Sequence, residues 1–252
     1  MAAPALLRLL ALPLALAPLH AQAQEPTQVA ALQTVTVVGT TVLPGVGTPL
    51  SQVPANVQTL RGEALSAPRA ATIAQALDAG AGSVNVNDTA GNPYQLDVNF
   101  RGFTASPALG TPQGLSVFVD GVRVNEAFGD TVNWDLIPAG AIARLAVIPG
   151  SNPAFGLNTL GGALSVSTRD GFDEDGGQLR LLGGAWGRRA VDGEIGGHTA
   201  HLAWFAAADA LHEDGWGAHD PSRVAQFFGK LGWREGADRV DASLSLAGTR
   251  LA

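Results

Sequence analysis

The sequence contains no cysteine, and only 15% of its residues are charged. Beyond residue 23 it also lacks a run of the roughly 18 apolar residues that indicate a membrane-spanning helix. Without cysteine, the chain has no disulfides, thiolate metal sites or cysteine nucleophiles. The formal net charge is −7 and basic residues do not cluster, so we expect no nucleic-acid partner, because phosphate binding relies on clustered cations. A soluble protein and a membrane β-barrel remain as classes.

Motifs for catalysis and metal binding are missing as well. The sequence has no G-x-S-x-G, no P-loop and no dinucleotide fingerprint, so we expect neither an enzyme nor a bound cofactor. The acidic run 173–175 lacks the remaining ligands of a calcium loop and is expected to be a solvated turn. The histidines near the C-terminus match no helical metal motif and are expected at strand ends and in a loop. They are His198, His201, His212 and His219.

Residues 1–23 have the features of a secretory signal peptide. A positive start that includes Arg8 is followed by an apolar run over 9–19 and by the small-x-small cleavage site at 21–23. An N-terminal membrane anchor fits less well, because the apolar run contains proline and is shorter than the roughly 20 residues of a spanning helix. We expect the mature chain to begin near Gln24, outside the cytoplasm.

The next part of the chain, residues 51–171, is predicted to be a compact α+β domain. A short helix is expected over 72–80, with Thr72 in a capping box and Gly80 at its end. In LSVFVDGVRVN, Asp120-Gly121 joins two alternating runs and predicts a hairpin with a type I′ turn. Further strands are expected at 53–60, at 83–87 and within 160–171, and the stretch 134–150 suggests a short helix over 138–144 followed by a strand.

Beyond GFDEDGG, at 171–177, the sequence changes to regular alternating strands. In 239–249, Val240 and Leu244 share one face with other apolar residues, while the polar residues occupy the opposite face. Tight turns are expected at Gly196-Gly197 and 235–237, and a longer loop over 212–222. The five predicted strands are 178–185, 189–197, 199–210, 223–234 and 239–249.

A half-buried sheet of a soluble sandwich would also alternate. Three features favour a membrane barrel. The strands are about ten residues long, their outer faces carry no central charge, and tryptophans fall near strand ends. These tryptophans are Trp186, Trp204, Trp216 and Trp233.

The order of these parts resembles the TonB-dependent outer-membrane receptors of Gram-negative bacteria over essentially the whole mature chain. The segments that carry the resemblance are TVTVVGT after the signal, DVNFRGF at 97–103, SVFVDGVRVN at 116–125 and IARLAVIPGSNPAFGLNTLGGALSVSTRDG at 142–171. Pro149 stands where the family commonly has arginine and Phe155 where it commonly has tyrosine, which suggests a divergent subgroup.

The resemblance implies an α+β plug domain followed by an antiparallel transmembrane β-barrel of about 22 strands, of which this chain holds the first five or so. We therefore expect a C-terminally truncated receptor, with a packed plug beside an open, curved sheet of four to six strands. The implied divisions are a signal peptide at 1–23, a periplasmic segment at 24–50, a plug at 51–171 and the start of the barrel at 172–252.

The resemblance also implies a TonB box at 33–39, in which an extended segment pairs edge-on with a strand of the periplasmic protein TonB. The residues expected to bind TonB are Thr34, Val35, Thr36, Val37 and Val38. The alternative is that 34–38 is an N-terminal strand of the plug itself.

Ligand contacts are expected from loops at the plug apex, over 87–95, 104–113 and 125–134. The candidate ligand-binding residues are Asn92, Tyr94, Gln95, Gln113, Asn125 and Phe128, and Arg101 is expected to be a structural partner at the plug–barrel wall. The implied function is TonB-dependent uptake of a scarce nutrient, most simply a ferric siderophore, through an outer membrane whose lipid surrounds the barrel. Haem, cobalamin and oligosaccharide are alternative ligands, and a soluble secreted ligand-binding β-protein is the alternative of another class.

Overall fold

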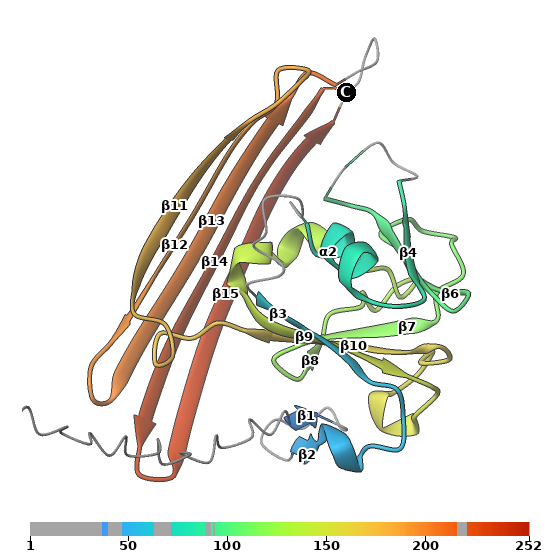
Figure 1. The fold of residues 1–252 in the computed structure, drawn as a ribbon, viewed down its shortest axis with the longest axis horizontal. Coiled ribbons are helices and arrows are strands. Elements are labelled where there is room, and N and C mark those ends of the chain that lie inside the picture. The colour runs from blue at the N-terminus through green and yellow to red at the C-terminus, as the bar shows by residue number, and fades with distance from the viewer. Residues whose placement is uncertain are drawn as a thin grey trace, which may run out of the picture. The chain divides into compact units, whose positions relative to one another are not determined.

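Figure 1 shows the computed structural model of the chain, which describes residues 37–39, 47–62, 72–88, 92, 94–215 and 221–251. The chain divides into two compact units, Met1–Thr34 and Val35–Ala252, and all described residues belong to the second unit. The predicted signal peptide and the predicted TonB-binding residues Thr34, Val35 and Thr36 lie outside the described residues.

A short antiparallel pair begins the described chain. Strand β1 (Val37–Gly39) pairs with β2 (Gly47–Pro49), so that Val38 is opposite Thr48, and the 3-10 helix η1 (Leu50–Gln52) follows. Val37 and Val38, which belong to the predicted TonB box, therefore have a strand partner within the chain itself.

The central sheet of the next domain has five strands in the order β3-β9-β10-β7-β8. Their bounds are β3 (Gln58–Arg61), β7 (Leu115–Val119), β8 (Val122–Arg123), β9 (Ile142–Pro149) and β10 (Gly162–Thr168). Strand β10 is parallel to β7 and antiparallel to β9. The predicted hairpin is confirmed, because Asp120 and Gly121 adopt φ values of 47° and 83° between β7 and β8, as a type I′ turn requires.

A helix and a second, three-stranded antiparallel sheet complete this domain. Helix α2 (Ile73–Gly80) is capped as predicted, since Thr72 Oγ1 accepts a hydrogen bond from the Gln75 N–H at 3.3 Å. The sheet consists of β4 (Val84–Asn87), β5 (Asp97–Phe100) and β6 (Phe103–Ala105). One core joins the helix to both sheets, and its most deeply buried members include Leu77, Val98, Phe100, Val117, Ile142, Leu145 and Leu164.

Two predicted elements of this domain are wrong in extent. The helix expected over 138–144 is only the 3-10 turn η3 (Ala139–Ala141), and β9 already begins at Ile142. Strand pairing decides the outcome, because β9 lies between β3 and β10 and uses the hydrogen-bonding groups of both its edges. The strand expected over 53–60 is shorter, since β3 begins only at Gln58. Two further 3-10 helices are η2 (Trp134–Leu136) and η4 (Pro153–Phe155).

The C-terminal part forms one antiparallel sheet in sequence order, with β11 and β15 at its edges (Figure 1). Its strands are β11 (Gly176–Gly183), β12 (Arg189–His198), β13 (Leu202–Glu213), β14 (Ser222–Glu235) and β15 (Asp238–Leu251). The five predicted strands and the open sheet are thereby confirmed, as is the tight turn before Asp238. Among the described residues, no helix is both long and apolar enough to cross a membrane.

The turn expected at Gly196-Gly197 is in fact at 199–201, because β12 continues to His198. Thr199 closes this turn by a hydrogen bond from its N–H to the Leu202 carbonyl at 2.7 Å. Gly197 serves a different purpose, since a Cβ there would lie 2.6 Å from the ring of Trp204. The glycine permits close approach of an aromatic ring within the sheet rather than a change of chain direction.

Candidate functional site

The outer face of the C-terminal sheet carries exposed apolar residues, whereas the inner face buries polar residues together with apolar ones such as Phe205, Leu211 and Phe228. On β14, Gln226 and Lys230 point toward the plug domain and are 5% and 8% exposed. Phe227 and Leu231 point the other way and are 39% and 65% exposed. A sheet with polar residues inside and apolar residues outside is typical of a membrane barrel wall. The candidate functional site is therefore the face of the sheet against which the plug domain lies.

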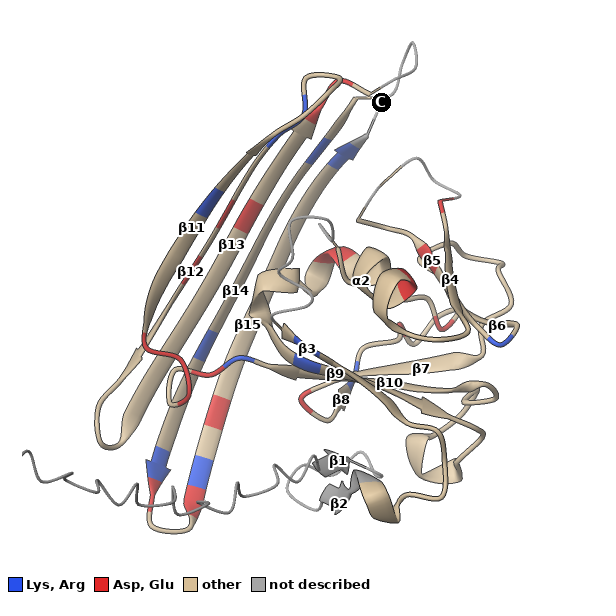
Figure 2. Cartoon of the chain, viewed as in Figure 1, with Lys and Arg blue, Asp and Glu red and all other residues tan. Residues whose placement is uncertain are grey.

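Lys230, whose side chain is 8% exposed, forms an ionic contact between plug and sheet. Its Nζ donates to Asp120 Oδ2 at 3.0 Å and to Thr168 Oγ1 at 2.9 Å. Asp120 comes from the β7–β8 turn and Thr168 from the end of β10, so one lysine of the wall contacts two strands of the plug sheet. Figure 2 shows β14 with its basic positions at separate heights along the strand.

A second group of ionic contacts surrounds the connection between β10 and β11. Arg169 Nη1 lies 3.0 Å from Glu194 Oε1 on β12 and 3.7 Å from Glu174 Oε1. Arg239 of β15 pairs with Asp170, and the Arg234 guanidinium lies 3.9 Å from the ring centroid of Phe172. Residues of β12, β14 and β15 thus hold this connection against the sheet.

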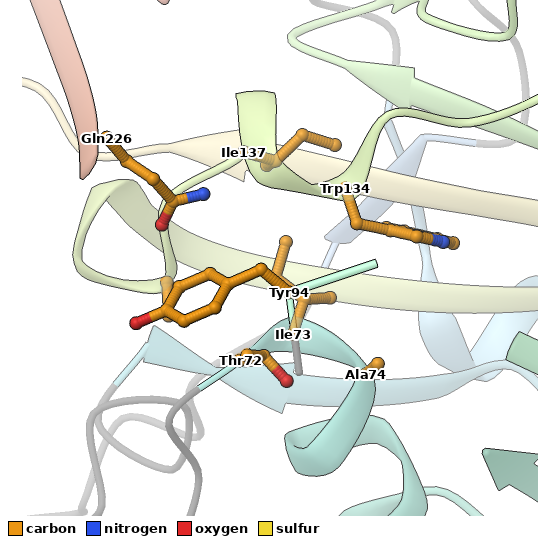
Figure 3. A pocket seen from close by; sticks show the side chains of 8 residues that line it. Thr72, Ile73, Ala74, Tyr94, Trp134, Ile137 and Gln226 are labelled. Atoms are coloured by element: carbon orange, nitrogen blue, oxygen red, sulfur yellow. The ribbon is translucent and has the colours of Figure 1, made fainter. Parts of the chain in front are cut away.

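A third contact region lies farther along the same face and includes the small pocket in Figure 3. Gln226 Nε2 donates to the Asp135 carbonyl, and Thr249 Oγ1 donates to Asp135 Oδ2 at 3.0 Å. The pocket is lined by Thr72, Ile73, Ala74, Tyr94, Trp134, Ile137, Ala139 and Gln226. The indole N–H of Trp134 and Oε1 of Gln226 are buried there without a hydrogen-bond partner in the described structure.

Tyr94 is one of the predicted ligand residues, but its side chain packs against the sheet. It is buried in a cluster with Leu211 and Val224. Burial raises the pKa of the Tyr94 hydroxyl, and the negative charge of Asp209 adds to the increase. Tyr94 therefore contributes an apolar surface that holds the plug to the wall.

The other predicted ligand residues with amide side chains are engaged within the plug. The Asn92 side chain accepts from the Tyr94 N–H at 2.9 Å, and Gln95 accepts from the Trp134 N–H at 3.2 Å. Gln113 accepts from the Ser106 N–H at 2.8 Å and donates to the Ser106 carbonyl at 3.3 Å. These bonds hold the loops in shape, and the ligand role of these residues stays a prediction.

Asn125 and Phe128 belong to one loop but differ in environment. Asn125 Oδ1 accepts from the Val117 N–H at 2.7 Å, while its Nδ2 donates to the carbonyls of Leu115 and Asp130, both at 3.1 Å. Phe128 is 80% exposed, so its ring is available to a ligand or to further protein. Of the six predicted ligand residues, Phe128 has the most accessible side chain.

The role of Arg101 as a structural partner at the plug–barrel wall stays a prediction. Arg101 lies exposed in the turn between β5 and β6, with φ of 51°, and its guanidinium is 5.0 Å from the ring centroid of Phe100. These features place Arg101 in a turn of the plug rather than against the strands β11–β15. The next residue is a glycine with φ of 87°, so the local turn geometry explains the RG pair.

Sequence reasoning missed the residues that join plug and wall. The sequence predicts Asp120 only as a turn residue, and nothing in the sequence pairs it with Lys230. One signal was available in the sequence. Lys230 is the only lysine of the chain, and strand alternation places it on the same face of the sheet as Gln226. A single lysine among many arginines, on the lumen face of a strand, points to a specific partner.

Comparisons with known proteins agree with this geometry. The family model of the TonB-dependent receptor plug domain matches residues 49–163. This range lies almost wholly within the predicted plug at 51–171, whose limits remain a prediction. The matched domain belongs to receptors rather than to enzymes. A comparison with curated proteins finds no match.

Solved structures share the fold of the described chain. FpvA from P. aeruginosa, bound to iron and pyoverdine, matches with a TM-score of 0.62 and 12% identity, over 81% of this chain and 26% of that one. FauA from Bordetella pertussis, the alcaligin outer-membrane receptor, matches with a TM-score of 0.61 and 15% identity, over 81% and 34%. PirA from Pseudomonas aeruginosa, a siderophore receptor, matches with a TM-score of 0.54 and 20% identity, over 79% and 36%. The chain thus spans about a quarter to a third of the length of these structures.

Proposed function

We propose that residues 49–163, which the family model of the TonB-dependent receptor plug domain matches, form the plug of such a receptor, and that the chain takes part in uptake of a ferric siderophore across a bacterial outer membrane. The observation that carries the proposal is the inverted sheet, with Gln226 and Lys230 buried against the plug and Phe227 and Leu231 exposed. In a barrel, this arrangement places the plug in the lumen and the apolar face in lipid.

The siderophore is the ligand class that the similar structures favour. FpvA was solved with iron and pyoverdine, and FauA is described as an alcaligin receptor. For this chain, we propose that the ligand approaches the plug loops that include Phe128, whose ring is exposed. Haem, cobalamin and oligosaccharide are the alternatives that the uptake assay below distinguishes.

Energy for transport would come through the TonB box at 33–39. The proposed contact is strand addition, in which backbone hydrogen bonds between Thr34–Val38 and a strand of TonB supply the affinity. The support is the β-rich sequence of this segment. Because β1 is paired with β2, a strand of TonB would have to pair with the other edge of β1 or replace β2.

The test is proline substitution within the box of the full-length receptor, expressed in a Gram-negative host. We expect Val35→Pro or Val37→Pro to abolish energy-dependent uptake of a radiolabelled ferric siderophore while leaving its binding at 4 °C unchanged. Proline removes a backbone donor and breaks strand addition. Val29→Pro, in the same segment but outside the box, is the matched control and should transport normally.

Three results would contradict the proposal. Normal uptake in both box variants would mean that TonB docks elsewhere. Loss of uptake in Val29→Pro as well would show that the whole segment is sensitive to proline. Uptake of haem, cobalamin or an oligosaccharide in place of every siderophore tested would refute the ligand class but leave the transport mechanism standing.

A further inference from the structure

The only lysine of the chain, Lys230, is buried between the sheet and the plug. Its side chain is 8% exposed and its ammonium group has two plug partners, Asp120 Oδ2 at 3.0 Å and Thr168 Oγ1 at 2.9 Å. A buried ammonium is strongly unfavourable unless it is paired, so the position of Lys230 is stable only when both partners are in place.

Asp120 makes that pairing depend on the order of the plug sheet. Its Oδ1 accepts from the Thr168 N–H at 2.8 Å, its Oδ2 accepts from Thr168 Oγ1 at 2.5 Å, and its own N–H donates to the Val166 carbonyl at 2.9 Å. These bonds close the end of the parallel pair β7–β10. Lys230 therefore contacts an arrangement that exists only while β7 and β10 are paired.

In the described part of the chain, the other ion pairs between plug and sheet do not have this property. Arg169 and Asp170 pair with Glu194 and Arg239, but they belong to the segment that covalently continues into β11. These contacts persist near the connection whatever the plug sheet does. Asp120, in contrast, is 110 residues from Lys230 in sequence, so its contact reports the position of the plug body.

We propose that Lys230 is a positioning residue of the transporter: it fixes the plug sheet against the wall through Asp120 and Thr168, and it is released when the plug sheet leaves the wall or when β7 and β10 separate. This inference rests on the proposed function for its role in transport, but the contact itself is testable without transport. Because the chain has one lysine, the exposure of Lys230 can be measured directly in the native sequence.

The first experiment is amine labelling of the full-length receptor in detergent micelles with an N-hydroxysuccinimide ester, followed by mass spectrometry of the peptide that contains Lys230. Should other lysines occur elsewhere in the full-length protein, the peptide readout separates them. We expect Asp120→Asn to raise the labelling rate of Lys230 at least tenfold over wild type.

The matched control is Asp130→Asn, which removes a plug carboxylate that contacts Arg123 and Asn158. It should label at the wild-type rate. Equal rates in wild type and Asp120→Asn, or equal acceleration by both variants, would overturn the proposal.

The second experiment separates positioning from general stability. In Lys230→Met, hydrogen exchange should rise over 115–123, which contains β7 and β8, and over 162–168, which is β10. It should stay unchanged in β4 and β5. Lys230→Arg should restore the protection, because a guanidinium keeps the charge and the donors. A uniform increase over the whole plug in Lys230→Met, or no increase at all, would show that Lys230 does not position these strands. Neither experiment needs TonB or a siderophore, so failure here is distinct from failure of the proposed function.

Discussion

Substitution of Asn125 by alanine decides whether this residue holds the plug or binds a ligand. Its amide group makes three hydrogen bonds, to the Val117 N–H at 2.7 Å and to the carbonyls of Leu115 and Asp130 at 3.1 Å each. Each such bond contributes on the order of 1 kcal/mol, so Asn125→Ala should lower the free energy of plug opening by about 3 kcal/mol. That difference corresponds to roughly a hundredfold faster hydrogen exchange of the Val117 amide.

The assay is hydrogen exchange with mass spectrometry on the full-length receptor, read over β7. Asn133→Ala is the control, because the Asn133 side chain donates a single bond, to Glu126 at 2.8 Å, and its φ of −84° suits alanine. It should accelerate exchange by no more than about tenfold, since one bond contributes on the order of 1 kcal/mol. If Asn125→Ala leaves the exchange of β7 unchanged but weakens siderophore binding, Asn125 is a ligand residue and the structural reasoning is wrong.

Two further predictions concern the contact between plug and sheet. Tyr94→Phe should make the free energy of unfolding less dependent on pH above about 10, because the raised pKa keeps the buried hydroxyl neutral while the unfolded chain loses its proton near 10. Stability should therefore fall with rising pH in wild type, by at most about 1.4 kcal/mol per pH unit from this group, and an identical alkaline slope in Tyr94→Phe would contradict this account. Gly197→Ala should destabilise the sheet by about 1–3 kcal/mol in urea unfolding, because its Cβ would lie 2.6 Å from the Trp204 ring. Gly248→Ala, where nothing lies within 4 Å, is the control and should be nearly neutral.

The strands of the wall could be predicted because alternation repeats a simple rule over many residues. Each residue of β14 and β15 belongs to one of two faces, and Val240 and Leu244 are exposed on the predicted apolar face. The hairpin at Asp120-Gly121 was equally accessible, since the need for positive φ is local. These features depend on neighbours in sequence.

The wrong predictions all depend on distant residues. The helix expected over 138–144 gives way to β9, because strands β3 and β10 provide pairing on both its sides. The turn expected at Gly196-Gly197 is absent there, because the glycines accommodate a ring from the next strand. The local sequence does not distinguish a glycine in a turn from a glycine that permits the close approach of an aromatic ring.

The candidate ligand residues show the same limit. Loop amides such as Gln95 and Gln113 are suited both to a ligand and to backbone groups of their own loop. Their hydrogen bonds to the N–H groups of Trp134 and Ser106 follow from the folded plug alone. Phe128 could be distinguished only by its exposure, which the sequence does not encode.

The division of contacts within the molecule fits a plug that moves as a unit. The main apolar core lies inside the plug, where α2 and both sheets bury Leu77, Val117 and Leu145. The contacts with the wall combine ionic and hydrogen-bonded pairs with two apolar clusters that are much smaller than this core, Ala141 with Phe205, Ala207 and Phe228, and Tyr94 with Leu211 and Val224. Water can replace a polar contact at low cost, whereas it cannot replace buried apolar area. A pulling force should therefore separate the plug from the wall before it disrupts the plug core, and the contact between Lys230 and Asp120 has to break in that step.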